Sequence, residues 1–332
     1  MHSCLMAILC CWLPAAAQLQ AGVARVSITP TEENIPTQLG GYGARQGNPA
    51  EGVLDTLYGK ILVMQRGDEK AAVITLDVCS VPINLVEETL AAGAPGLTLE
   101  NTLVCASHSH TGLEGFALDR RNIADNPNIG VFSEDMLNFV VKRLAAGVRE
   151  ANEHLHPVKA ASGIARLSGM NRNRRGADCV DDQMTVLRLD KTDGAPLAIL
   201  VNFTAHGTFV DETDMLLSGE WAGEMQRVVE ALMGDDTLCL YANGAEGDVA
   251  PAGRHGGSHY EQAFNYGRKV GIEAWKLARG LRPTEVTDFS VRSTWASLPE
   301  RRGAPDFIKI AGDEYNVTQE QLELLLTVMF PE

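Results

Sequence analysis

The sequence has few basic residues relative to its acidic ones, and few aromatic residues. Its 332 residues include 28 Lys and Arg against 43 Asp and Glu, for a formal net charge of -15, and aromatic residues make up 6% of the chain. Without an excess of positive charge there is no surface to neutralise phosphates, so we expect no nucleic acid among the partners. The Lys and Arg residues are scattered among acidic ones, and no basic amphipathic helix for membrane binding is predicted.

Long hydrophobic runs are also missing. No run reaches the roughly 20 apolar residues that span a bilayer, so no transmembrane anchor is predicted. The opening segment MHSCLMAILCCWLPAAAQ is short and apolar and ends in small residues, which is typical of a secretory signal peptide. We assign residues 1–19 to this leader, place its cleavage near Ala17 or Gln18, and expect a secreted or periplasmic protein.

Closely spaced cysteine pairs are absent as well. Seven cysteines are present, three of them in the leader, and no CxxC spacing indicates a cysteine zinc site. Cys79, Cys105 and Cys239 lie in apolar runs, where buried free thiols are expected. Cys179 lies in the loop ADCVDD, where it either pairs, binds a ligand or stays free.

The apolar pattern alternates between strands and helices. Two hairpins are predicted at residues 59–77, with a turn at Gly67 and Asp68, and at residues 184–205, with a KTDG turn. Further strands are expected at residues 102–107 and 237–242. This pattern predicts an α/β fold with mixed β-sheets layered with helices.

Four helices are expected between and after these strands. They begin near Ser80 and Pro82, at Ser133, at Trp221 and near Tyr260, and the second carries a continuous apolar stripe. The last 50 residues differ in character, and the stretch 280–284 is the first persuasive boundary. There we predict a strand at residues 287–295 and a helix that opens with a capping box formed by Thr318 and Gln321.

The most informative motif is ASHSHTG, at residues 106–112, where a buried strand is expected to end. His108 and His110 are two residues apart, so in an extended chain both imidazoles face one pocket. Such a pair binds a metal or shares metal binding and proton transfer. The alternative is a pair of surface histidines.

A third histidine, His206, leaves the buried strand LAILVNFTA directly before a glycine. Alone it is more often a structural histidine, but with His108 and His110 it completes three imidazoles for a zinc ion (Zn2+). Bound zinc lowers the pKa of water to about 7, so hydrolysis is the expected chemistry.

Two loops carry further polar groups. In NGAEGDVAP, Glu246 and Asp248 either orient a ligand histidine, act as acid and base, or form a simple acidic turn. In NRNRR, at residues 171–175, the arginines either clamp an anion or form a solvated basic loop.

Taken together, ASHSHTG, NRNRR, VNFTAHG and NGAEGDVAP resemble, in order and surroundings, the neutral or alkaline non-lysosomal ceramidases and their bacterial relatives. LGGYGAR at residues 39–45 and GVLDTLYGKILVM at residues 52–64 are similar to the N-terminal segments of that family. The resemblance covers about residues 21–280. It implies that residues 20–332 form a ceramidase-like catalytic domain whose C-terminal part is incomplete.

The resemblance also implies roles for four residues. It assigns zinc binding to His108 and His206, and it places His110 and Arg172 in the active site. The family's other zinc ligands, a glutamate and a tyrosine, match nothing in this chain, and we do not promote the terminal Glu332 to a ligand. Ceramidases carry a serine within GDVSP, where this chain has Ala250.

These observations predict a zinc hydrolase that uses metal-activated water to cleave an amide or ester bond in a small-molecule or lipid N-acyl substrate, with ceramide as one candidate. Two other functions stay open: a non-catalytic member of the family that binds zinc or another ligand, and a metal-dependent phosphoesterase with the arginines as a phosphate clamp. The sequence does not define an oligomeric state.

Overall fold

The computed structural model describes residues 17–31, 33–116, 120–122, 130–234, 236–297, 306, 309–310, 312–313 and 318–329. The apolar part of the proposed leader and Glu332 lie outside these residues, so secretion stays a prediction. Among the described helices, none is long and apolar enough to cross a membrane.

Eight strands form one large sheet. They are β1 (Gln20–Ser27), β4 (Tyr58–Arg66), β5 (Glu69–Leu76), β6 (Thr102–Ala106), β8 (His156–Arg166), β10 (Gln183–Lys191), β11 (Pro196–Phe203) and β13 (Leu238–Asn243). Six short strands pair outside it: β2 (Gln38–Leu39), β3 (Gly52–Val53), β7 (Leu113–Glu114), β9 (Asn171–Asn173), β12 (Leu216–Leu217) and β14 (Val249–Pro251). The helices are α1 (Ile83–Gly93), α2 (Glu134–Glu153), α3 (Glu220–Met233), α4 (His259–Gly280) and α6 (Gln319–Met329).

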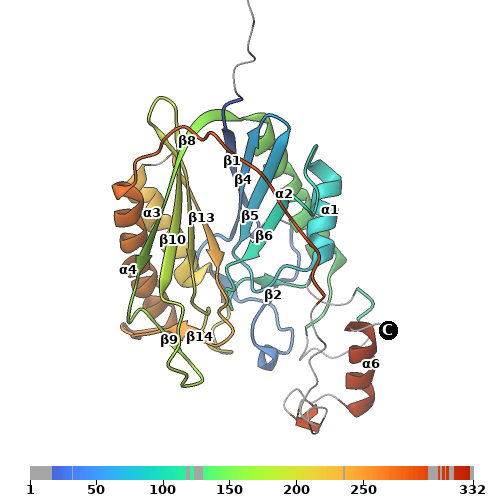
Figure 1. Cartoon of the computed structure of the whole chain (residues 1–332). Coiled ribbons are helices and arrows are strands. Elements are labelled where there is room, and N and C mark those ends of the chain that lie inside the picture. Colours follow the sequence, from blue (N-terminus) through green and yellow to red (C-terminus); the bar gives the residue numbers. More distant parts are fainter. Residues whose placement is uncertain are drawn as a thin grey trace, which may run out of the picture.

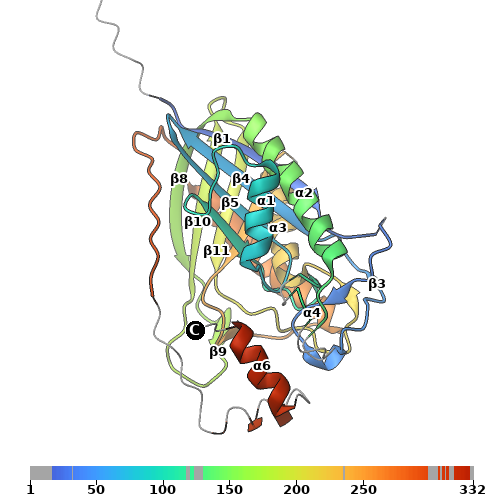
Figure 2. The ribbon, with the colours of Figure 1, turned by 90° about the vertical axis from the view of Figure 1, so that its right-hand side faces the viewer.

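The large sheet folds back on itself into two facing halves. Its order is β13-β11-β10-β8-β1-β4-β5-β6, and among the described strands the halves pair where Gln20 and Ala21 of β1 meet Pro157 and His156 of β8. The edge strand β13 contacts β4, β5 and β6 of the other half. Helices α3 and α4 cover one half and α1 and α2 cover the other, which gives four layers (Figure 1). In Figure 2, α1 and α2 lie side by side, and α2 packs on β1 and β4.

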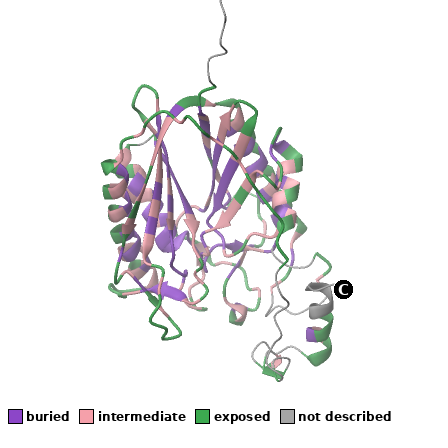
Figure 3. Cartoon of the chain, in the orientation of Figure 1, coloured by how far each residue is buried: buried purple, intermediate pink, exposed green. Residues whose placement is uncertain are grey.

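Burial on both faces explains why the strands read as continuous apolar runs. On β4, Ile61 and Val63 face the core under α2, whereas Leu62 faces the core between the two halves. On β13, Tyr241 packs under α3 and α4, and Leu240 faces the other half. The buried positions consequently follow the interior of all four layers (Figure 3).

Most of the predicted elements are confirmed. Both hairpins form, β4 with β5 and β10 with β11. Ser133 caps α2 by accepting from the Met136 amide, and Thr318 and Gln321 cap α6 reciprocally. The helix α1 differs, because its cap is Pro82 and Ser80 lies outside it.

The strand predicted at residues 287–295 does not form. After α4 the chain makes one bridge, from Thr284 to Ala160 of β8, and then runs extended without strand pairing. Val286 and Phe289 pack against the core between the halves. This segment therefore crosses the open side of the layers as a strap (Figure 1).

Candidate metal centre

Two strands bring the predicted histidines together at one end of the layers. His108 follows β6 of one half, and His206 follows β11 of the other. Beyond them, Ser109 and Gly207 form a parallel bridge. The imidazole centroids of His108 and His206 are 4.4 Å apart, and that of His110 lies 4.9 Å and 5.1 Å from them. The sequence prediction of three imidazoles at one site is thus supported by the geometry.

We expected an extended backbone at the HxH motif, and the structure has a turned backbone there instead. His108 has a φ of 61°, in the left-handed region that residues with a Cβ rarely adopt. Gly207 makes this conformation compatible with close packing, because a Cβ on it would lie 2.3 Å from the His108 carbonyl oxygen. The imidazoles therefore come together because the backbone turns at His108 and because a glycine follows His206.

Backbone carbonyls fix the tautomers of His108 and His206. His108 Nδ1 lies 2.7 Å from the Cys79 carbonyl oxygen, and His206 Nδ1 lies 3.1 Å from that of Glu246. Because a carbonyl oxygen only accepts, each Nδ1 must carry a proton, so that in the neutral imidazole each Nε2 presents a lone pair. The two Nε2 atoms face each other at 3.0 Å.

Two lone pairs at this separation repel each other unless a cation lies between them. Zinc binds imidazole nitrogen at about 2.0–2.1 Å, so one ion can contact two nitrogens that are 3.0 Å apart. The bond from each Nδ1 to a carbonyl is the usual support of a metal-binding histidine. The residues present therefore fit a metal ion.

Cys79 adds a sulfur atom on the other edge of the His108 ring. Its Sγ lies 3.8 Å from His108 Nδ1, and Cys79, His108 and His110 each offer a ligand atom within 4.8 Å of the others. Burial raises the pKa of the Cys79 thiol to about 12. Cys79, Cys105, Cys179 and Cys239 are all free. Of the three thiols that we expected to be buried, that of Cys239 is buried and those of Cys79 and Cys105 are half-buried, while Cys179 is exposed.

His110 is the most enclosed of the three histidines. Its ring packs edge-on against Tyr42, and a Cβ on Gly41 would lie 2.4 Å from its Cγ. Both ring nitrogens are buried and have no hydrogen-bond partner within the described residues. Burial, followed by the neighbouring His108 and His206, lowers the pKa of His110 to about 3. A neutral imidazole with two unsatisfied nitrogens is consequently available to a ligand.

Arg45 explains why the LGGYGAR segment belongs to the site. Its buried guanidinium donates to the carbonyls of Gly40 and His110 and to those of Asp211 and Asp214. The side chain thereby ties the backbone of His110 to two other loops. We singled out this segment by its resemblance to a family, and we did not predict a role for Arg45.

Glu220 is a second residue that sequence reasoning missed. It begins α3 with a φ of 50°, is 1% exposed, and its Oε1 accepts from Ser109 Oγ at 3.0 Å and from the amides of His110 and Thr111 at 2.6 and 3.2 Å. Burial raises its pKa to about 8, although these bonds act in the opposite direction. An acid before a helix normally indicates capping, so no local signal pointed to this contact.

The two predicted acidic residues have separate roles. Glu246 orients His206 through its backbone carbonyl, and its carboxylate lies 3.8 Å from His108 Nδ1. Asp248 accepts from Asn173 and so fastens the NRNRR loop to the NGAEGDVAP loop. The group that holds His206 is thus the backbone carbonyl of residue 246 and not the carboxylate that we expected to orient it.

The arginines of the NRNRR loop differ in their contacts. Arg172 lies on β9, opposite Ala250 of β14, and its exposed guanidinium makes no hydrogen bond or ion pair within the described part of the chain. Arg174 donates to the Gly247 carbonyl, and its charge contributes to the lowered pKa of both His110 and His206. Within the NRNRR loop, Arg174 is thus the arginine whose charge acts on the cluster, and Arg45 acts more strongly on His110.

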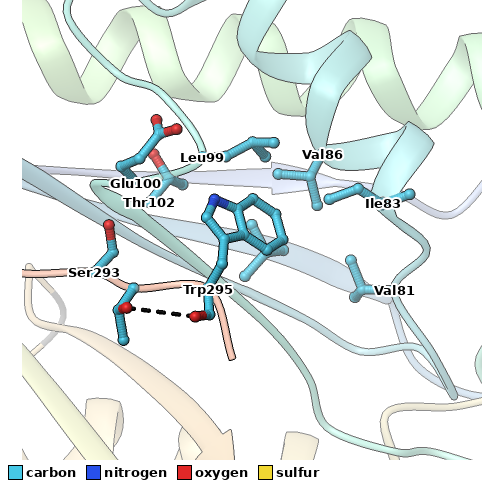
Figure 4. Close-up of a pocket in the computed structure, with 10 residues that line it drawn as sticks. Val81, Ile83, Val86, Leu99, Glu100, Thr102, Ser293 and Trp295 are labelled. Atoms are coloured by element: carbon cyan, nitrogen blue, oxygen red, sulfur yellow. Dashed lines mark hydrogen bonds between the residues drawn. The ribbon is translucent and has the colours of Figure 1, made fainter. Parts of the chain in front are cut away.

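Two other features lie apart from the cluster. His259 Nδ1 lies 2.7 Å from Asp214 and 3.6 Å from Asp211, whose backbone carbonyls already hold Arg45. An apolar cavity of about 400 Å³ lies between α1, β6 and the strap (Figure 4). Trp295 borders it and is 83% exposed, and none of the clustered histidines lines it.

With this geometry in view, the family assignment can be made. The model of the neutral/alkaline non-lysosomal ceramidase N-terminal domain matches residues 19–259. The chain belongs to the neutral/alkaline non-lysosomal ceramidase family. The match contains all the histidines of the cluster as well as Arg45, Arg172 and Glu220.

Individual ceramidases are similar over most of this chain but are longer. Neutral ceramidases B and A of Dictyostelium discoideum are 24% and 23% identical, over 64% and 55% of this chain, and the matched parts are 33% and 29% of those proteins. The crystal structure of neutral ceramidase from Pseudomonas aeruginosa matches with a TM-score of 0.67 at 20% identity, over 80% of this chain and 45% of that one. A ceramidase complexed with C2 matches with a TM-score of 0.66 at 18% identity, over 79% of this chain and 43% of that one. The chain thus shares the ceramidase fold and spans about a third of the curated relatives.

Proposed function

We propose that this chain is a zinc-dependent hydrolase that cleaves an amide bond in an N-acyl lipid, with ceramide as the first candidate. Family membership and the ceramidase names of its relatives support the reaction class. The observation that carries the proposal is the pair of Nε2 lone pairs, 3.0 Å apart, whose Nδ1 atoms are held by carbonyls. This arrangement calls for a cation.

His108 and His206 would hold the zinc ion. When bound, zinc supplies a Lewis acid and lowers the pKa of coordinated water to about 7. His110 offers two unsatisfied ring nitrogens beside the pair for a hydrogen bond to substrate or water. Arg174 carries a positive charge that acts on His206, and Arg172 lies in the same NRNRR loop. Both guanidinium groups would favour negative charge that develops on a carbonyl oxygen.

The phosphoesterase alternative has less support. Metal-dependent phosphoesterases generally need several carboxylates around their ions, and Asp248 is engaged by Asn173 instead. A non-catalytic zinc-binding protein is the stronger competitor, because catalytic zinc normally has three protein ligands and the facing pair supplies two.

Two measurements test the proposal. We expect the purified protein to retain zinc after dialysis, and a variant with His108→Ala and His206→Ala to lose it. His255→Ala, at an exposed position, is the matched control. Release of fatty acid from a fluorescent short-chain ceramide then tests hydrolysis. Equal zinc in parent and double variant would sink the metal assignment, and zinc binding without hydrolysis would favour the non-catalytic member.

A further inference from the structure

Asn243, the last residue of β13, contacts both segments that carry the paired histidines. Its Nδ2 donates to the carbonyl oxygen of Ser107 at 3.1 Å and to that of Ala205 at 3.2 Å. Ser107 directly precedes His108, and Ala205 directly precedes His206. One side-chain amide therefore holds the two chain segments at the points where they enter the cluster.

The other end of the amide fixes its orientation. Oδ1 accepts from the amide of Gly244 at 2.9 Å and from that of Ala205 at 3.3 Å, and the Tyr241 hydroxyl lies 2.9 Å away. Backbone N–H groups only donate and carbonyls only accept, so exchanging nitrogen and oxygen would disrupt every backbone contact. The amide is thus held in the one orientation that can bridge Ser107 and Ala205.

This bridge matters because the two segments belong to different halves of the sheet. His108 follows β6 and His206 follows β11, and β6 and β13 are the opposite edges of the eight-stranded order. Within the described residues, no strand pairing joins β6 to β13. Together with the Ser109–Gly207 bridge on the far side of the histidines and Glu246, which approaches both rings, the Asn243 amide links the two segments.

We infer that Asn243 is a positioning residue that sets the distance between His108 Nε2 and His206 Nε2. The inference rests on the proposed metal site and deepens it. Asn243 touches neither imidazole nitrogen, so it acts through the backbone on both sides. Groups that support metal ligands in this indirect way typically change metal affinity by about 10- to 100-fold.

Asn243→Asp is the sharpest variant, because it keeps the shape and Oδ1 but turns the donor into an anion that faces two carbonyls. Asn243→Ala removes the bridge without adding charge. Asn202→Ala is the matched control, since Asn202 lies on the neighbouring strand and donates only to Ala242. We expect about 10- to 100-fold weaker zinc binding for both Asn243 variants in chelator competition, and parent affinity for the control.

Substitution of cobalt for zinc distinguishes a change in the position of the two histidines from a simple loss of protein stability. The visible spectrum of bound cobalt reports ligand geometry, so at saturating cobalt we expect a changed spectrum in folded Asn243→Ala. A parent spectrum and parent zinc affinity in both Asn243 variants would overturn the inference and leave the proposed function standing.

A measurement on metal-free protein distinguishes failure of the proposed function from failure of the inference about Asn243. Histidine-selective NMR should show Nδ1–H protons for His108 and His206 in the parent and in Asn202→Ala, and their loss or broadening in Asn243→Asp. If the parent binds no zinc, the proposed function fails, and these proton signals still decide whether Asn243 positions the rings. Unchanged signals in Asn243→Asp would then overturn the inference as well.

Discussion

The two paired histidines are supported differently. The His108 segment, residues 107–111, leaves an edge strand in a left-handed turn and rests on the buried carboxylate of Glu220. The His206 segment, residues 205–208, leaves the interior strand β11, and the loop carrying Glu246 and Val249 binds the His206 ring and amide through carbonyls. One side of the centre depends on an ionisable group and the other on the backbone.

Despite this difference, both sides produce the same tautomer. In each case a carbonyl takes the Nδ1 proton and leaves Nε2 free. Backbone carbonyls do not titrate, so the groups that hold each ring at Nδ1 stay acceptors at every pH, whereas the Glu220 carboxyl that supports the His108 segment titrates. The groups that orient the two histidine rings are therefore different from the groups that stabilise the loops carrying them.

The largest effect is expected on the His206 side, from Arg172. Arg172→Lys keeps the charge but loses the planar fork, and loss of an oxyanion donor typically costs about 100- to 1,000-fold in turnover. Arg172→Ala and Arg172→Lys should both lower turnover of an N-acyl substrate and leave zinc content unchanged.

Arg174→Ala is the comparator, since Arg174 is fastened to Gly247 and acts on His110 and His206 by charge. Unaltered turnover in both Arg172 variants, with a large loss in Arg174→Ala, would transfer the role to Arg174. Loss of zinc together with activity would instead indicate that the loop is structural.

The next effect concerns the His108 side and its dependence on pH. The pKa of Glu220 is raised to about 8 by burial, so between its unfolded value and pH 8 the folded protein holds a proton that the unfolded chain has released. The free energy of unfolding should consequently fall as pH rises through this range, by up to about 1.4 kcal/mol per pH unit.

Glu220→Gln keeps the Oε1 acceptor and removes the titration. Urea unfolding of metal-free protein between about pH 5 and about pH 8 should show a flatter pH dependence in this variant than in the parent. Glu273→Gln, at an exposed position on α4, should follow the parent. Identical pH dependence in Glu220→Gln and parent would remove Glu220 as the ionisable support of this segment.

The smallest effect is expected from Ala250→Ser. Ala250 is 4% exposed on β14, next to the Val249 carbonyl that accepts from the His206 amide. A hydroxyl added there does not change the histidine pair, so turnover of a short-chain ceramide should change by less than about 10-fold. A much larger gain would show that the His206 side lacks a reacting hydroxyl and that the metal pair is not limiting.

The local sequence pattern was sufficient to predict the helices and strands whose apolar residues are large and regularly spaced. The hairpins and α2 followed from such patterns, but β8 did not, because HPVKAASGIAR has small and polar residues and is defined by its pairing with β10. The strap at residues 287–295 has the alternation of a strand yet finds no partner strand. Strand formation is a long-range property, so alternation alone overpredicts it.

The same distinction applies to the site. His108, His110 and His206 were predictable because each follows a recognisable strand or shares a short motif. The roles of Glu220 and Asn243 were not, although Asn243 opens the NGAEGDVAP motif, since their contacts join residues 110 and 136 positions apart in the chain. No local signal reports which backbone groups such a side chain will meet.

The two histidines whose nitrogens face each other are far apart in the sequence, and this has a consequence for biosynthesis. His108 and His206 are 98 positions apart, and the strand that ends at Asn243 is made later still. Since the N-terminal part of a chain leaves the ribosome first, the HxH motif emerges long before its partner. A zinc finger uses its ion to fold, whereas the two histidines that would hold an ion here follow strands in different halves of the sheet and meet only when both halves have formed. Metal loading would thus report completion of the fold rather than initiate it.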